Sequence, residues 1–249
     1  MRIAAAQIPS VDGDINTNIQ YHLQAITQAA QHQISMLIFP EMSLTGYLLK
    51  DAAQHAISVD DSRLDVFTDV AQKYEMTLAI GAPINTPDSK DIFIGLIIFH
   101  PNGNREQYKK MFLHGEENDY FMSGESAKVF QHMEHKIGLA ICADTNHTEH
   151  PKLLANQHAS IYAASVMFTA SAYDVDAGAL RSYSEQHNML TLMANYNVES
   201  GGWPGTGKSA VYWAGKELIC ADRTLNQLVI AEYNNGQWRG DLVELELNF

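Results

Sequence analysis

Short apolar runs alternate along the chain with longer segments whose apolar residues recur at helical spacing. The first kind predicts buried strands and the second predicts amphipathic helices, because residues three or four apart share one face of a helix. The predicted strands are residues 2–6, 36–39, 77–80, 92–99, 136–141, 160–163, 190–194 and 228–233. The predicted helices are residues 16–30, 62–74, 148–157 and 177–187. This alternation predicts an α/β fold.

Turn signals and the C-terminal pattern refine this prediction. The sequence PNGN at residues 101–104 predicts a hairpin turn between antiparallel strands, because Asn-Gly accepts the positive φ of tight turns. Residues 242–249, LVELELNF, alternate as an edge strand or a dimer arm does. Hairpins mixed with helices favour a layered α/β sandwich over a purely parallel sheet. No linker or internal repeat interrupts the chain, so we expect residues 1–249 to form a single domain.

Composition and charge exclude several classes of protein. Hydrophobic residues make up 46% and charged residues 18% of the chain, which is ordinary for a globular protein. The net charge of −13 argues against nucleic acid and anionic membranes as partners. The N-terminal apolar run is too short for a signal peptide, and residues 92–99 fall far short of the roughly 20 residues of a membrane helix. Two cysteines make no disulfide framework, so we expect a soluble, cytoplasmic protein.

Polar side chains with catalytic potential follow three predicted strands. Glu41 follows the strand at residues 36–39, and Cys142 follows the strand at residues 136–141 in the sequence IGLAICAD. Lys110 and Glu117 flank a loop in YKKMFLHGEENDYF. A lone cysteine is more often a small buried hydrophobe than a nucleophile. Polar residues at strand ends can converge over one edge of a sheet, however, so we expect a common site.

These motifs resemble those of the nitrilase-like carbon–nitrogen hydrolases. The matching residues are Pro40-Glu41 and Thr45-Gly46-Tyr47 for the family's PE…TGY, Tyr108, Lys110 and Leu113 for YxKxxL, Gly138, Ile141, Cys142 and Asp144 for G…ICxD, and Glu117, Phe121 and Gly124 for ExxxFxxG. Weaker motif matches extend the resemblance over almost the whole chain. Departures at Ile94, at Thr148-Glu149 and at His158 leave these motifs intact. The resemblance implies a single-domain, four-layer α-β-β-α sandwich, and its register selects Lys110 and Glu117 over their neighbours Lys109 and Glu116.

The resemblance also implies a reaction and a role for each residue. Cys142 is implied as the nucleophile, Glu41 as the general base, and Lys110 with the backbone N–H of Ala143 as the oxyanion stabiliser. Glu117 is implied to orient Lys110 or the substrate. Elementary chemistry agrees, because a free thiol has a pKa of about 8.5 and needs a base to become a good nucleophile. We therefore expect hydrolysis of a non-peptide carbon–nitrogen bond through a cysteine thioester.

The substrate is less defined, because catalytic residues fix only the reaction class. A small linear amide is favoured, including an ω-amide or an N-carbamoyl compound. N-acyl transfer and nitrile hydrolysis by the same Glu-Lys-Cys triad are the alternatives, and a non-catalytic binding protein is a third hypothesis that the intact triad opposes. Residues 45–51 also resemble the glutaminase domains that supply ammonia to synthetases. No synthetase domain follows them in this sequence, so we expect a freestanding amidase.

Loops are expected to supply the specificity of the pocket. The candidate segments are residues 47–51, 117–122, 146–147, 166–173 and 197–203, and within them Tyr47, Asn146 and Met167 are the candidates for substrate contact.

Histidines and the second cysteine suggest no further site. Of the 11 histidines, residues 132 and 135 and residues 147 and 150 are spaced three apart, without further ligands at metal-site spacing. We therefore expect no metal and no cofactor. Cys220 lies in a strand-like run and is predicted to be a core residue. Members of the resembled family usually self-associate, so a homodimer or a larger homo-oligomer is expected.

Overall fold

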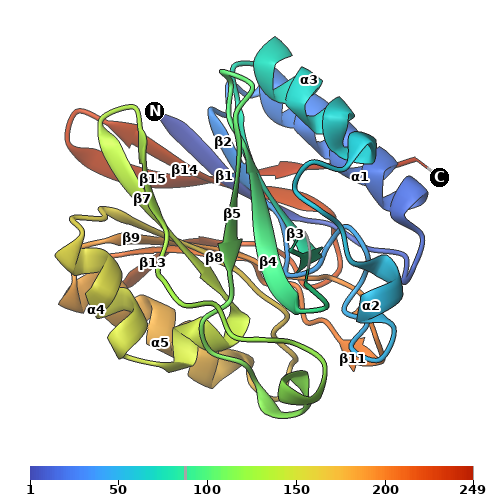
Figure 1. The fold of residues 1–249 in the computed structure, drawn as a ribbon. Coiled ribbons are helices and arrows are strands. Elements are labelled where there is room, and N and C mark those ends of the chain that lie inside the picture. The colour runs from blue at the N-terminus through green and yellow to red at the C-terminus, as the bar shows by residue number, and fades with distance from the viewer. Residues whose placement is uncertain (87–88, 249) are drawn as a thin grey trace.

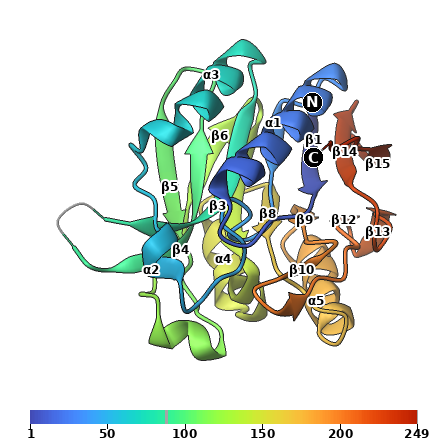
Figure 2. The same cartoon turned by 90° about the vertical axis from the view of Figure 1, so that its right-hand side faces the viewer.

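A computed structural model of the chain describes residues 1–86 and 89–248. Two large sheets lie face to face, and helices cover the outer face of each sheet (Figure 1). Within the described residues, one sheet has seven strands in the order β15-β14-β1-β2-β3-β4-β5, and the other has six in the order β13-β12-β9-β8-β7-β6. This arrangement confirms the predicted four-layer α-β-β-α sandwich, and Figure 2 shows it from a second direction.

The bounds of the elements are as follows. The seven-stranded sheet consists of β1 (Arg2–Gln7), β2 (Met36–Ile38), β3 (Thr77–Asn85), β4 (Ile92–Phe99), β5 (Arg105–Lys109), β14 (Gln227–Asn234) and β15 (Gln237–Glu244). The six-stranded sheet consists of β6 (Val129–His132), β7 (His135–Ile141), β8 (Ile161–Ser165), β9 (Leu190–Ala194), β12 (Ala210–Trp213) and β13 (Lys216–Cys220). The α-helices are α1 (Ile15–Gln31), α2 (Ala52–His55), α3 (Asp65–Lys73), α4 (Glu149–Asn156) and α5 (Tyr173–Gln186). Three 3₁₀ helices, η1 (Ser62–Leu64), η2 (Gly115–Asp119) and η3 (Cys142–Asn146), and a small hairpin of β10 (Glu199–Ser200) and β11 (Trp203–Pro204) complete the described part.

Three hydrophobic cores hold the four layers together. One joins α1 and α3 to the seven-stranded sheet, a second lies between the two sheets, and a third joins α4 and α5 to the six-stranded sheet. Helix α1 shows how the sequence determines this packing. The Asp14 side chain caps its first turn by accepting a hydrogen bond from the Thr17 N–H, and Ile19 and Ile26 on one face are buried.

Several strands end at the same edge of the sandwich because of the directions in which they run. β1, β2 and β3 are parallel, and β5 is antiparallel to β4, which is itself antiparallel to β3. The end of β5 therefore lies at the same edge as the end of β2. In the other sheet β7, β8 and β9 are parallel. The Ser165 hydroxyl at the end of β8 donates to the Phe39 carbonyl beyond β2 at 2.7 Å, so the carboxyl edges of the two sheets meet.

Every strand and helix predicted from the apolar pattern is present in the structure, although several begin or end at other residues than predicted. The turn at residues 101–104 joins the antiparallel strands β4 and β5, as predicted. Helix α5 begins at Tyr173, four residues before the predicted start at residue 177. β15 is the edge strand of its sheet but ends at Glu244, so only the first part of the segment predicted at residues 242–249 is strand, and residue 249 lies outside the described residues.

The prediction of a core position for Cys220 was wrong. This residue ends β13, the outer strand of the six-stranded sheet, and is only partly buried. An outer strand has no neighbour on one side, so its side chains pack less completely. None of the helices in residues 1–86 and 89–248 combines the length and the apolar character that crossing a bilayer requires.

Candidate active site

Glu41 lies in the tight loop that follows β2. Its side chain is fully buried, and its carbonyl accepts a hydrogen bond of 2.7 Å from the Tyr196 hydroxyl. The loop packs directly on β3, because a Cβ atom built on Gly81 would lie 2.4 Å from the Pro40 oxygen and 2.5 Å from the Met42 nitrogen. Only glycine allows this close approach, so the backbone on both sides of Glu41 is fixed against the sheet.

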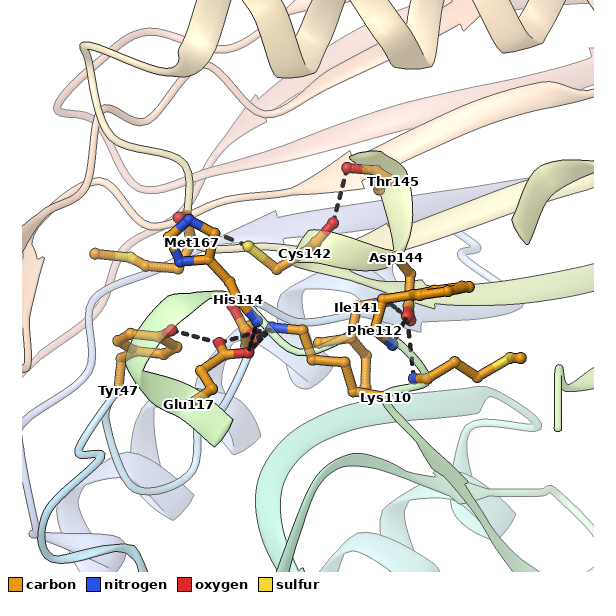
Figure 3. A network of polar contacts seen from close by, with 12 residues as sticks. Tyr47, Lys110, Phe112, His114, Glu117, Ile141, Cys142, Asp144, Thr145 and Met167 are labelled. Carbon is orange, nitrogen blue, oxygen red and sulfur yellow. Dashed lines mark hydrogen bonds and ion pairs between the residues drawn. The ribbon is translucent and has the colours of Figure 1, made fainter. Parts of the chain in front are cut away.

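Lys110 directly follows β5, and its side chain reaches Glu41. Its Nζ atom is 2.7 Å from Glu41 Oε1, and it is 2.7 and 2.8 Å from the two carboxylate oxygens of Glu117. All three side chains are buried. Figure 3 shows the Lys110 ammonium beside the Glu117 carboxylate and below the Cys142 sulfur. One ammonium is therefore shared by two carboxylates in a water-poor environment.

The Glu117 carboxylate accepts more hydrogen bonds than the Glu41 carboxylate does. Besides Lys110, it accepts hydrogen bonds from the Tyr47 hydroxyl and from the His114 backbone N–H at 2.7 Å. By contrast, Glu41 Oε2 is buried and has no hydrogen-bond partner among the described residues that meets ordinary distance and angle criteria. Glu41 thus keeps one oxygen without such a bond, and the neighbouring Cys142 thiol interacts with this carboxyl group closely enough to lower its pKa.

Cys142 forms a sharp elbow between β7 and η3. Its φ angle is +40°, a left-handed value that is unfavourable for a residue with a Cβ atom. The Thr145 hydroxyl supports the elbow by donating to the Cys142 carbonyl at 2.7 Å. The sulfur lies 3.9 Å from the Met167 carbonyl oxygen at the end of β8. At this elbow the thiol lies close enough to Glu41 and Lys110 for their charges to shift its pKa.

Asp144 connects this elbow to the loop after Lys110. Its Oδ1 accepts from the backbone N–H groups of Met111 and Phe112 at 3.0 and 2.9 Å. Its Oδ2 accepts from the Ile141 N–H at 2.9 Å and from the Tyr108 hydroxyl at 2.6 Å. One buried carboxylate therefore fixes the strand end that carries Lys110 relative to the strand end that carries Cys142 (Figure 3).

Burial and charge set the protonation of the site. Burial raises the pKa of Glu41 to about 7; Lys110 opposes this shift, and the Glu117 charge adds to it. Burial also raises the pKa of the Cys142 thiol well above its usual value, with a further contribution from Glu41. Burial acts to lower the pKa of Lys110, but the negative charges of Glu41, Cys142 and Glu117 outweigh it and raise this pKa. At neutral pH the resting site thus holds a thiol, an ammonium and a carboxyl group close to its titration midpoint.

A pocket of about 100 Å³ opens above the Cys142 sulfur. Ala143 and the three residues predicted to contact substrate, Tyr47, Asn146 and Met167, all line it together with Cys142. The structure brings these five residues together with Glu41, Lys110 and Glu117 around one centre. Among the described residues, no group of three or more His, Cys, Asp or Glu side chains has the arrangement of a metal site.

Two residues of the pocket were not predicted. His114 lies in the loop between Lys110 and Glu117, and Asp176 lies in the first turn of α5. His114 lies within the segment YKKMFLHGEENDYF, but it matches no residue of the motifs in that segment. Asp176 falls just before the predicted start of the helix at residue 177. The structure places it at the pocket because α5 begins earlier.

The four-layer sandwich thus carries a buried carboxylate and ammonium beside a partly buried thiol at one edge. The model of the family "Carbon-nitrogen hydrolase" matches residues 2–236, so the chain belongs to this family of enzymes.

Curated relatives and solved structures agree with this family. An (R)-stereoselective amidase from a Pseudomonas species is 24% identical over 88% of this chain and 76% of its own length. A glutamine-dependent NAD(+) synthetase from Acinetobacter baylyi is 23% identical over 77% of this chain, and the match spans only 34% of that longer protein. Among solved structures, a variant of a nitrilase-superfamily amidase from Nesterenkonia has a TM-score of 0.86 at 20% identity, over 95% of this chain and 92% of its own.

Proposed function

We propose that the protein hydrolyses the carbon–nitrogen bond of small linear amides through a thioester on Cys142. The observation that carries this proposal is the Lys110 ammonium, bonded to Glu41 and Glu117 in a fully buried cluster beside the Cys142 thiol. Such a cluster is unfavourable for stability, because buried ions must be desolvated. It is well suited to a reaction that moves one proton and forms one oxyanion.

The two carboxylates take different roles in this mechanism. Glu117 accepts hydrogen bonds from Lys110, Tyr47 and the His114 N–H, so both of its oxygens are occupied by fixed donors. It therefore serves as the fixed carboxylate that positions Lys110. Glu41 has one bond from Lys110, a free oxygen, and a pKa of about 7, close to the ideal for a group that takes and returns a proton at neutral pH.

Acylation begins when the amide carbonyl carbon lies against the Cys142 sulfur. Glu41 removes the thiol proton as the C–S bond forms, because the raised pKa of Cys142 keeps a free thiolate scarce before substrate binds. The carbonyl oxygen becomes an oxyanion, which Lys110 and the Ala143 N–H stabilise. Protonated Glu41 then gives its proton to the amide nitrogen. The C–N bond breaks, ammonia leaves, and Cys142 carries a thioester.

Proton transfer to Glu41 also makes Lys110 available to the oxyanion. In the resting site the three donors of the ammonium face carboxylate oxygens of Glu41 and Glu117. Once Glu41 is neutral, its attraction for Lys110 falls. The new oxyanion can then replace it as the partner of Lys110 at the moment when negative charge appears on the substrate.

Deacylation repeats the same steps with water. Glu41 removes a proton from a water molecule that attacks the thioester carbonyl, and Lys110 again stabilises the oxyanion. The C–S bond breaks, the sulfur regains a proton from Glu41, and a carboxylic acid is released. The proton and the sulfur return to their starting state, so no cofactor is required.

Relatives support this assignment by analogy. The Nesterenkonia amidase has been solved in complex with butyramide, and another of its structures has an acetamide moiety attached covalently to that protein's active-site cysteine. We propose that Cys142 has the corresponding role here. We further propose that one domain carries the whole site and that the enzyme acts in the cytoplasm as a homodimer or larger homo-oligomer.

Ammonia release from a panel of butyramide, glutamine, N-carbamoyl amines and butyronitrile tests the proposal. We expect turnover of the simple amide, its loss in Cys142→Ala, and its retention in the matched variant Cys220→Ala. Full amide turnover by Cys142→Ala would contradict the mechanism. Preferential turnover of butyronitrile would indicate a nitrilase, and a new amide product on addition of an amine acceptor would indicate N-acyl transfer.

A further inference from the structure

Asp176 introduces a carboxylate into the wall of the pocket. It lies in the first turn of α5, is partly buried, and lines the same cavity as Cys142. Burial raises its pKa, whereas the charge of His114 and a side-chain hydrogen bond with Asn146 lower it. All three residues line the pocket, so this carboxylate is oriented by groups that the substrate also meets.

No side chain of permanent positive charge balances Asp176. Among the described residues that line the pocket there is no lysine or arginine. Lys110 lies behind Cys142 and is already shared by Glu41 and Glu117. An anionic substrate would therefore approach three carboxylates and one ammonium. The net charge of −13 for the whole chain adds a long-range repulsion of the same sign.

Aromatic rings that line the pocket also favour the binding of a cation. Trp203 on β11 is 42% exposed and lines the pocket together with Tyr47 and Phe168. The face of an aromatic ring attracts ammonium groups, and tryptophan does so most strongly.

Stabilisation of the helix is the alternative role for Asp176, since acidic residues favour the N-terminal turn of a helix. Asp174 already supplies an acidic side chain in the same turn, and it is exposed to solvent. Asp176 instead is partly buried at the pocket, where desolvation opposes its charge. A substrate ammonium would add a positive partner to that of His114.

We infer that this pocket selects small amides that carry an amino group and discriminates against amides that carry a carboxylate, with Asp176 as the specificity-determining residue. The inference rests on the proposed amide hydrolysis and adds the substrate class. A pocket of about 100 Å³ encloses only a short chain, since a cavity of about 150 Å³ holds one benzene. Glutamine carries both an α-ammonium and an α-carboxylate, and because the carboxylate would lack a cationic partner, we expect glutamine to be a poor substrate despite its terminal amide.

Isosteric pairs of amides test this inference, because each pair differs only by an ammonium in place of a methyl group. The pairs are glycinamide with propionamide, β-alaninamide with butyramide, and 4-aminobutanamide with valeramide, and succinamate and glutamine serve as carboxylated probes. In the wild-type enzyme we expect kcat/KM for the best amino amide to exceed that of its neutral partner by about five- to tenfold. Both carboxylated probes should be slower than butyramide.

Two isosteric variants of the same helix turn identify the residue responsible. Asp176→Asn should reduce the preference ratio of the best pair to about one, whereas Asp174→Asn, which removes one charge from the same turn outside the pocket, should keep the wild-type ratio. Turnover of butyramide without any preference for the amino amides would overturn the inference and leave the proposed function intact. An unchanged ratio in Asp176→Asn would also overturn it, whereas no turnover of any amide would refute the proposed function itself.

Discussion

The Lys110 ammonium donates to both carboxylate oxygens of Glu117, at 2.7 and 2.8 Å, and neither side chain is exposed to solvent. Desolvating such a pair requires several kcal/mol per ion, and the attraction between the partners repays it only while both remain. The site is therefore stable as a unit and strongly destabilised by removal of one member. Since Glu41 depends on the same ammonium, the effect of losing Lys110 is larger than that of losing one ion pair.

Lys110→Met tests this dependence. We expect the free energy of unfolding at neutral pH to fall by about 3–5 kcal/mol, because two carboxylates remain buried without a cation. The loss should diminish at lower pH, because a protonated Glu41 no longer needs the cation. Amide turnover should fall by about 100- to 1,000-fold, as for removal of an oxyanion donor. Urea unfolding at several pH values measures the first effect, and ammonia release measures the second.

Lys109→Met is the matched control for this variant. Lys109 is the adjacent lysine, but its ammonium bonds to the Thr86 hydroxyl at 3.2 Å and lies over the Phe93 ring, away from the acidic cluster. We expect a change in unfolding free energy within about 1 kcal/mol. Equal losses in both variants would show that the cluster around Lys110 has no special energetic role.

The pH dependence of turnover follows from the raised pKa of Glu41. The general base must be ionised in the free enzyme, so kcat/KM should fall about tenfold per pH unit below a pKa of about 7. Initial rates of ammonia release between pH 5 and 9 measure this fall in kcat/KM. A fall that begins only near pH 4.5, the ordinary pKa of a glutamic acid, would contradict the assignment of Glu41.

The same pKa shift predicts how stability changes with pH. The folded state raises the pKa of Glu41 from 4.5 to about 7, so it binds this proton more tightly than the unfolded chain does. The resulting contribution to stability is complete below pH 4.5 and is lost as the pH rises through 7. Glu41→Gln removes the titrating group. Melting curves at several pH values should therefore show a weaker loss of stability between pH 4.5 and 7 in this variant than in the wild type.

The strands that carry these residues could be predicted because strand ends can be read from an apolar pattern. A buried run that ends shortly before Glu41 or directly before Cys142 places each residue near the carboxyl end of a strand. Parallel strands then bring these ends to one edge of each sheet, and no long-range information is needed beyond the chain direction. Lys110 follows the same logic, because the PNGN hairpin reverses the direction of β5.

The rim of the pocket was harder to predict for a specific physical reason. Helix α5 begins after Ala172, which provides no side-chain cap, so the sequence has no start signal there. The helix was expected to begin at residue 177, and Asp176 was therefore not assigned to its first turn. The role of Asp144 was also hidden, because its partners Met111 and Phe112 are distant in sequence and bind it through backbone N–H groups, which leave no trace in residue type.

Asp144→Asn tests whether this carboxylate positions Lys110 relative to Cys142. An amide has only one acceptor oxygen, so its NH₂ group would face donors such as the Ile141 N–H. We expect a loss of about 2–4 kcal/mol in unfolding free energy. We also expect a lower kcat with a smaller change in KM, because the reacting groups lose their alignment. Tyr108→Phe removes one of the four donors and should have the smaller effect on both measures.

Gly81→Ala tests whether the close packing of the Glu41 loop on β3 is required for turnover. The added Cβ would lie 2.4 Å from the Pro40 oxygen and 2.5 Å from the Met42 nitrogen, so the backbone on both sides of Glu41 has to move. A displacement of about 1 Å can reduce turnover by about 100-fold, and we expect a loss of kcat/KM of at least about tenfold. Gly178→Ala is the control, because its Cβ would meet nothing within 4 Å and an alanine stabilises a helix by about 0.5–1 kcal/mol. Wild-type kcat/KM in Gly81→Ala, measured on protein whose melting curve shows that it is folded, would mean that the loop can shift without moving the Glu41 carboxylate away from Cys142.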